Sequence, residues 1–187
     1  MLITRPARFY CAVAIAAFIT IAMGCHGSWA QSVEQKFHLD FDTFDGHFSS
    51  WKLDDVGSVK SLRATIKVTR LGTHERWTPV LRIEVTSKST TDEYWGLLVT
   101  ADQHVAPLTA YSVQRSNKNT AQRDPFAKKI NTNEAVAVEL SWATAGKLLI
   151  RIGGEARELP MPAPVAGILV LSGTGDFHLD NVTLSTK

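Results

Sequence analysis

Aromatic residues with polar neighbours are the side chains of this sequence best suited to bind a ligand. Flat apolar rings stack against the C–H faces of sugar rings, while nearby amides and carboxylates bind the hydroxyls. Trp77 lies in the segment THERWTP, which predicts a loop, and Tyr94 and Trp95 open the run YWGLLVT. We therefore predict a carbohydrate-binding surface at Trp77, Tyr94 and Trp95. Packing beneath a sheet stays open as the alternative for each, because large aromatics also dominate cores.

Sequence signatures of common enzymes are absent. The chain has no G-x-S-x-G elbow, no Walker loop, no HExxH pair and no G-x-G-x-x-G turn. Its histidines lack zinc-ligand spacing, and both cysteines, Cys11 and Cys25, precede residue 31. These observations favour a non-catalytic binding protein. A hydrolase or lyase with a nonstandard site is the weaker alternative.

Alternation of apolar and polar residues is the main structural signal. It occurs in LRATIKVT, VLRIEVT, AVAVELSW and KLLIRIG, and it is the period of a half-buried strand. YWGLLVT and GILVLSG are apolar on both faces, as expected of strands that are covered on both sides. No segment after residue 30 keeps a helical period. An all-β antiparallel two-sheet sandwich is therefore the predicted fold.

Turn residues and polar stretches separate these strands. The segments ending in Gly146 and Gly154 predict hairpins, and Trp142, on the apolar face at the end of a strand, is predicted to lie in the core. Residues 115–133 form the longest polar stretch. We interpret it as a loop, either solvated or carrying binding residues on a rigid scaffold.

Two segments resemble a known group of folds. Val136 to Leu184 contains a tryptophan-ended strand, a hairpin, an x-Gly-Glu turn and the ending FHLDNVTL, and the opening segment is FHLDFDTFDGHFSSW. These segments resemble concanavalin A-like and laminin G-like jelly rolls, including carbohydrate-binding modules. The resemblance implies a jelly-roll sandwich that binds a polysaccharide or glycan. A protein-interaction or structural role in the periplasm or at the cell surface is the alternative, because sandwiches host many functions.

The acidic residues near the two ends suggest a structural ion. In DFHLDNVTLS the apolar face moves from odd to even residues, which predicts a β-bulge at Asp180 and Asn181. In the carbohydrate-binding modules that this ending resembles, an aspartate here helps to hold calcium with acids of the opening strand. The resemblance thus implies a calcium site at Asp40, Asp42 and Asp180, since Asp40 and Asp42 share a face. Ordinary solvent-facing aspartates are the alternative.

The first 30 residues predict a signal-peptide helix. Arg5 and Arg8 precede an apolar run from Phe9 to Gly24, and a small-residue site ends at Ala30. Cleavage leaves residues 31–187 as a single β-sandwich domain without a membrane span, in the periplasm or outside the cell. The segment Ala22-Met23-Gly24-Cys25 resembles a lipobox, so lipidation of Cys25 and anchoring at the membrane form the alternative.

Charge composition limits the partners of the exported domain. Removal of residues 1–30 takes away two arginines and no acid, which leaves 18 basic and 18 acidic residues. A neutral domain has no broad positive field to attract nucleic acid. The charge balance therefore predicts no nucleic-acid partner. The resemblance and the aromatic residues imply a carbohydrate as the partner, and no cofactor is expected other than the calcium ion.

Overall fold

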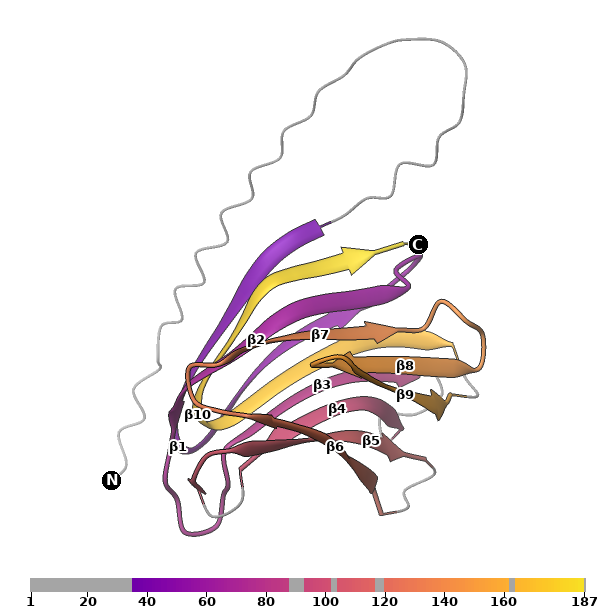
Figure 1. The fold of residues 1–187 in the computed structure, drawn as a ribbon. Coiled ribbons are helices and arrows are strands. Elements are labelled where there is room, and N and C mark those ends of the chain that lie inside the picture. The colour runs from indigo at the N-terminus through magenta and orange to yellow at the C-terminus, as the bar shows by residue number, and fades with distance from the viewer. Residues whose placement is uncertain (1–34, 88–92, 102–103, 117–119, 162–163, 187) are drawn as a thin grey trace, which may run out of the picture. The chain divides into compact units, whose positions relative to one another are not determined.

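The computed structural model describes residues 35–87, 93–101, 104–116, 120–161 and 164–186 (Figure 1). The regular elements of these residues are ten strands: β1 (Gln35–Asp54), β2 (Ser61–Leu71), β3 (Val80–Ser87), β4 (Tyr94–Thr100), β5 (Leu108–Arg115), β6 (Gln122–Ile130), β7 (Ala135–Ser141), β8 (Lys147–Ile152), β9 (Glu155–Pro160) and β10 (Val165–Ser185). The all-β prediction is confirmed. The predicted signal-peptide helix and Cys25 lie outside the described residues. Within those residues no helix is long and apolar enough to cross a membrane.

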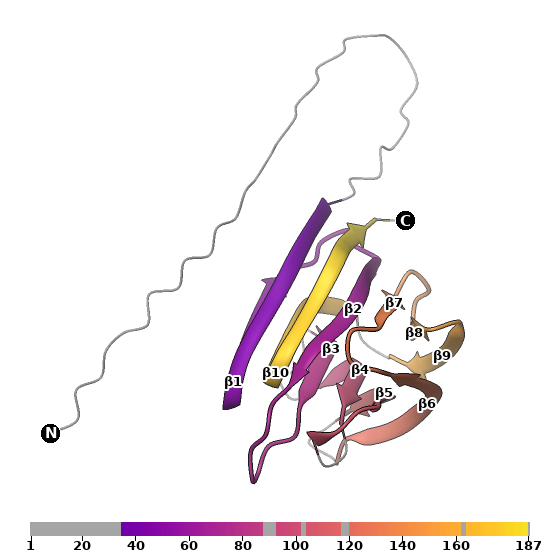
Figure 2. The same cartoon turned by 60° about the vertical axis from the view of Figure 1, so that its left-hand side comes forward.

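The strands form two facing antiparallel sheets that share β10. The first part of β10 pairs with β3 and its second part pairs with β2, while β1 runs along both parts. The front sheet has the order β6-β5-β4-β3-β10-β1, and the back sheet has the order β1-β10-β2-β7-β8-β9. Figures 1 and 2 show these two curved layers lying against each other. The predicted two-sheet sandwich is therefore confirmed.

Both shared strands bend where they pass from one sheet to the other. In β10 the bend lies at Gly173-Thr174-Gly175, where Thr174 adopts a φ of 53°. In β1 the register shifts between Thr43 and Phe48. Because each strand continues past its bend, the front and back sheets are joined by unbroken backbone on this side of the sandwich.

Alternate side chains of both sheets form the core. Trp95 and Trp142 are 2% and 6% exposed, and the Trp142 indole N–H donates to the carbonyl of Val59 at 2.8 Å. The predicted core position of Trp142 is confirmed. Each fully buried aliphatic or aromatic side chain contributes about 1.5–3 kcal/mol. The largest of those under 2% exposed, apart from the tryptophans, are Phe126, Phe177, Leu62, Ile66, Leu81, Ile83, Leu97, Leu108, Ile130, Leu140 and Leu148.

The edge strands β6 and β9 are tied together on the other side of the sandwich. The Glu155 carboxylate accepts hydrogen bonds from the backbone N–H groups of Ala127 and Lys128 at 3.0 and 2.6 Å. These contacts satisfy donors that an open sheet edge would leave unpaired. The prediction of a loop over residues 115–133 is therefore wrong for Gln122–Ile130. This edge strand exposes most of its residues, so its sequence carries little apolar alternation.

The predicted local features of the chain are found in the structure. Gly146, with a φ of 78°, turns the chain between β7 and β8, and Gly154, with a φ of 91°, does so between β8 and β9. The register of β10 against β2 shifts between Asp180 and Thr183, and Asn181 has a φ of 51°. Both hairpins and the bulge at Asp180 and Asn181 are confirmed.

Candidate functional site

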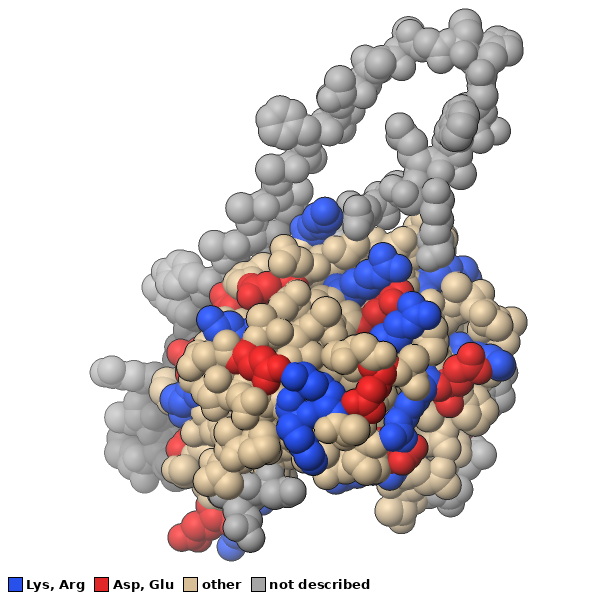
Figure 3. All heavy atoms as spheres, in the orientation of Figure 1, with Lys and Arg blue, Asp and Glu red and all other residues tan. Residues whose placement is uncertain are grey.

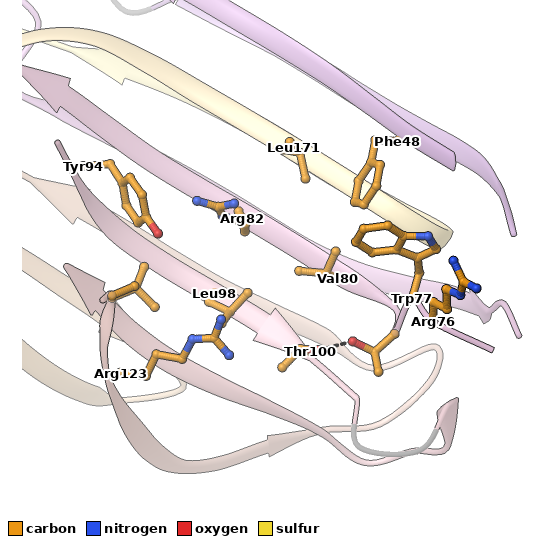
Figure 4. Close-up of a pocket in the computed structure, with 13 residues that line it drawn as sticks. Phe48, Arg76, Trp77, Val80, Arg82, Tyr94, Leu98, Thr100, Arg123 and Leu171 are labelled. Atoms are coloured by element: carbon orange, nitrogen blue, oxygen red, sulfur yellow. Dashed lines mark hydrogen bonds between the residues drawn. The ribbon is translucent and has the colours of Figure 1, made fainter. Parts of the chain in front are cut away.

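A groove of about 290 Å³ crosses the outer face of the front sheet (Figure 4). Its volume is at the lower end of the range of ~300–1,000 Å³ that is usual for ligand pockets. Aromatic, aliphatic and guanidinium groups converge on it from β1, β3, β4, β5, β6 and β10 and from the segment before β3. The lining residues are Phe48, Arg76, Trp77, Thr78, Val80, Arg82, Tyr94, Leu98, Thr100, Val113, Ala121, Arg123 and Leu171.

One end of the groove is formed by Phe48 and Trp77. Their rings meet edge to face with centroids 5.4 Å apart, and the side chains are 49% and 47% exposed. Figure 4 shows both rings at the same end, with Arg76 beside them. The Phe48 ring covers Gly173, where an added Cβ would lie 2.6 Å from the ring. A glycine is therefore needed in β10 for this ring to lie on the sheet.

The segment that carries Trp77 is fixed at both ends. At its start the Thr73 N–H donates to the Asp45 carboxylate at 3.0 Å, and a Cβ at Gly72 would lie 2.0 Å from the same carboxylate. At its end the Thr100 hydroxyl donates to the Pro79 carbonyl at 2.9 Å. Trp77 is thus held beside the groove by contacts with β1 and β4 that do not involve its own ring.

The floor of the groove holds Arg82, which pairs with the carboxylate of Glu84 buried beneath it. The Arg82 Nε–H donates to the Glu84 carboxylate at 2.8 Å, and the Arg82 guanidinium lies 4.8 Å from the centroid of the Tyr94 ring. Glu84 is only 2% exposed. Burial raises the pKa of Glu84, while the charge and hydrogen bond of Arg82 oppose that rise. Arg82 is therefore oriented both by a carboxylate and by an aromatic face.

Gly96 allows this pair to lie flat on the sheet. It is the register partner of Glu84 on β4, and a Cβ at Gly96 would lie 2.1 Å from the Ile83 carbonyl oxygen. Backbone atoms of β3 therefore occupy the space of a side chain at this point. Alternation along the paired strands β3 and β4 places Arg82, Glu84 and Tyr94 on one face of the sheet.

The structure separates the three predicted ligand-binding aromatics. Trp77 and Tyr94 line the same groove, although they lie in different elements. Trp95 points into the core and is 2% exposed, so the prediction for Trp95 is wrong. Adjacent residues of a strand point to opposite faces, so Tyr94, half-buried on the outer face, leaves Trp95 facing the core.

Phe48, Arg82, Glu84 and Arg123 are site residues that sequence reasoning missed. Arg82 and Glu84 share a face by period two, but the same alternation is typical of any half-exposed strand. Phe48 stands in a polar stretch of the opening segment, and Arg123 stands in the stretch that we interpreted as a loop. Only the pairing of β1 with β10 and of β6 with β5 brings them to the groove.

Two of the predicted calcium ligands belong to a histidine cluster on the outer face of the back sheet. His38 bridges Asp40 and Asp180, with nitrogen–oxygen distances of 2.7 and 2.8 Å. His178 hydrogen-bonds to Asp40 and, through its other ring nitrogen, to the Thr69 hydroxyl at 3.0 Å. The hydrogen bond to Asp40 raises the pKa of His38, although partial burial opposes this. Burial opposes ionisation of Asp40, but the hydrogen bonds from His178 and His38 hold its pKa below the usual value.

Asp42, the third predicted calcium ligand, belongs to a different group. It hydrogen-bonds to Asp176, and this contact raises the pKa of Asp42. Asp176 in turn accepts two hydrogen bonds from the Arg70 guanidinium, both at 2.9 Å, which lower the pKa of Asp176. Within the described residues no group of three or more His, Cys, Asp or Glu side chains is arranged to hold a metal ion. Calcium binding by Asp40, Asp42 and Asp180 stays a prediction.

Comparison with known proteins identifies the fold. No family model matches the sequence, and no curated protein sequence matches it. CG-16, a homodimeric agglutinin from chicken liver, matches 73% of this chain and 100% of its own, with 11% identity and a TM-score of 0.54. Congerin II liganded with lactose and MES matches 73% of this chain and 99% of its own, with 18% identity and a TM-score of 0.51. The fold is a concanavalin A-like jelly roll.

An enzyme shares this jelly roll. The alginate lyase PA1167 from Pseudomonas aeruginosa matches 71% of this chain and 66% of its own, with 12% identity and a TM-score of 0.54. Identities this low show the common fold alone. The jelly-roll resemblance of the sequence is confirmed, and the function must be argued from the groove itself.

Proposed function

We propose that this protein is an exported, non-catalytic module that binds carbohydrate in the groove of the front sheet. The observation that carries the proposal is the convergence of exposed Trp77 and Phe48 with the charged floor of Arg82 and Glu84 in one groove. The aromatic end offers an apolar surface for the face of a sugar ring. The Arg82 guanidinium, held by the buried Glu84 carboxylate, offers fixed hydrogen-bond donors for the hydroxyls.

The content of the groove favours binding over hydrolysis. Glycoside hydrolysis commonly uses two carboxyl groups on opposite sides of the scissile bond. In the described part of the chain no acidic side chain lines the groove, and the carboxylate beneath it, Glu84, is buried and paired with Arg82. One protein of similar fold, congerin II, was solved with lactose, which agrees with a sugar as the ligand.

A glycan array with the purified protein tests the proposal. Binding to at least one polysaccharide class is expected, and it should weaken at least tenfold in Trp77→Ala and in Arg82→Gln. Phe44→Ala is the matched control, because Phe44 is 74% exposed and does not line the groove. Absence of binding to every class, or equal binding by Trp77→Ala and Phe44→Ala, would contradict the proposal.

Export and calcium binding are two further proposals that the sequence supports. Mass spectrometry of the mature N-terminus distinguishes cleavage after Ala30 from lipidation of Cys25. For calcium, the melting temperature measured with and without a chelator is the test, since a bound ion stabilises the folded state by mass action. A melting temperature that the chelator leaves unchanged would remove the site at Asp40, Asp42 and Asp180.

A further inference from the structure

Ion pairing divides the arginines of this protein into two groups. Of the eight arginines within the described residues, five form ion pairs: Arg63 and Arg151 with Glu139, Arg70 with Asp176, Arg82 with Glu84, and Arg157 with Asp124. The other three, Arg76, Arg115 and Arg123, have no acidic partner among the residues that the structure describes. Their charges are therefore not neutralised within the described domain.

All three unpaired arginines belong to the groove or to its border. Arg76 and Arg123 line it from opposite sides, and Figure 4 shows the Arg123 guanidinium beside Leu98. Arg115 is the register partner of Tyr94 in the ladder of β4 and β5, so both side chains lie on the outer face. The Arg115 Nε is buried and has no hydrogen-bond partner. A buried donor of this kind costs free energy until an acceptor reaches it.

No acidic side chain among the described residues that line the groove offsets this charge. Glu84 lies beneath the floor at 2% exposure, and its charge is matched by Arg82. The exported domain as a whole carries 18 basic and 18 acidic residues. The part of the surface that Figure 3 shows over β7, β8 and β9 carries both signs interspersed. The described residues that line the groove therefore carry more positive than negative charge.

We propose that the groove selects an anionic polysaccharide, one that carries carboxylate or sulfate groups along its chain. This inference rests on the proposed carbohydrate-binding function and adds the class of ligand. The planar guanidinium group forms paired hydrogen bonds with the oxygens of a carboxylate or sulfate. Trp77 and Phe48 bind the apolar face of one sugar ring, while Arg76, Arg115 and Arg123 surround the acidic groups of the same chain.

Matched pairs of polysaccharides test this selectivity. Isothermal titration calorimetry compares oligogalacturonate with the same oligosaccharide after reduction of its carboxyl groups, and dextran sulfate with dextran. We expect at least tenfold tighter binding of the acidic member of one or both pairs, and the pair that responds identifies carboxylate or sulfate as the recognised group. The affinity for the acidic member should also fall as salt rises from 50 to 500 mM, because salt screens exposed charges.

Three charge-removing variants separate the groove from the rest of the surface. Arg76→Gln and Arg123→Gln should each weaken binding of the acidic member by about tenfold, as expected for loss of a charged hydrogen bond. Arg151→Gln removes the same charge from β8 of the back sheet and should leave the affinity unchanged. The melting temperatures of all three should stay close to that of the parent protein, because these side chains are exposed.

The outcomes distinguish this inference from the proposed function. Equal binding of acidic and neutral members would overturn the anionic selectivity and leave carbohydrate binding in place. No binding of any polysaccharide, here and on the array, would overturn both. Binding of polyglutamate as tight as that of the acidic polysaccharide would overturn the selectivity for a sugar chain, because charge alone would then suffice.

Discussion

Phe48 and Trp77 meet edge to face 5.4 Å apart, although 29 positions separate them in the chain. The contact joins β1, just after its bend, to the segment that leads into β3. Both rings keep about half of their surface exposed beside the groove. An aromatic pair of this kind, held from two directions, offers a rigid surface for a ligand and loses little side-chain entropy on binding.

Trp77→Ala is expected to weaken carbohydrate binding at least tenfold while it lowers the free energy of unfolding by less than about 1 kcal/mol, since half of the ring is already exposed. Trp77→Phe should keep part of the affinity because it retains an aromatic face. Affinity by calorimetry and stability by urea denaturation check both statements. A large loss of stability in Trp77→Ala would show that the ring supports the fold instead.

Two glycines of the front sheet should respond differently to alanine. Gly96→Ala places a Cβ 2.1 Å from the backbone carbonyl of Ile83, so we expect a loss of about 3 kcal/mol. Gly173→Ala places its Cβ 2.6 Å from the Phe48 ring, which is exposed and able to rotate away. It should therefore cost little stability and reduce binding through displacement of Phe48. Equal losses of stability in the two variants would contradict this account.

His38 should make stability depend on pH near neutrality. The hydrogen bond to Asp40 raises the pKa of His38 in the folded protein. His38 therefore stabilises the folded protein fully below its unfolded pKa of about 6.5. This stabilisation is lost as pH rises through the folded pKa. The side chain is half exposed, and the expected fall in melting temperature between pH 5.5 and 8.5 is at most about 3 °C. Scanning calorimetry of the parent protein and His38→Gln measures it. A fall of the same size in His38→Gln would assign the effect to other groups.

Arg70 should account for part of the stability that the protein loses at acid pH. Its hydrogen bonds lower the pKa of Asp176, and the Thr73 backbone and Arg70 together lower the pKa of Asp45. An aspartate whose pKa is lowered by folding stabilises the folded protein at pH values above its unfolded pKa of about 4. That stabilisation is lost as pH falls through the lowered pKa of the folded state. Arg70→Met should therefore cost about 1 kcal/mol at pH 7 and much less at pH 2.

The control for this prediction is Arg63→Met on the same strand. Arg63 pairs with Glu139 at an exposed position, and such pairs contribute little to stability. Urea denaturation at both pH values compares the two variants. A cost for Arg70→Met that does not change between pH 7 and pH 2 would show that packing, rather than ion pairing, accounts for it.

Local features of this protein could be predicted from its sequence. The strands β2, β3, β4, β7 and β8, both hairpins and the bulge at Asp180 and Asn181 depend on near neighbours, because alternation and turn residues act over a few positions. The core position of Trp142 follows from the same alternation. These elements alone were enough to predict an all-β sandwich.

The assembly of the groove was decided by tertiary structure. Tyr94 and Trp95 stand in a run that is apolar on both faces, so alternation alone does not tell which face is exposed. Phe48 reaches Trp77 through the bend that β1 shares with β10, and Arg123 lies on an edge strand whose polar sequence is typical of a loop. Asp42 lies beside Asp176 through pairing across more than 130 positions. The sequence by itself determined the strands that carry alternating or continuous apolar runs, whereas long-range pairing decided the polar edge strand β6 and which side chains share a site.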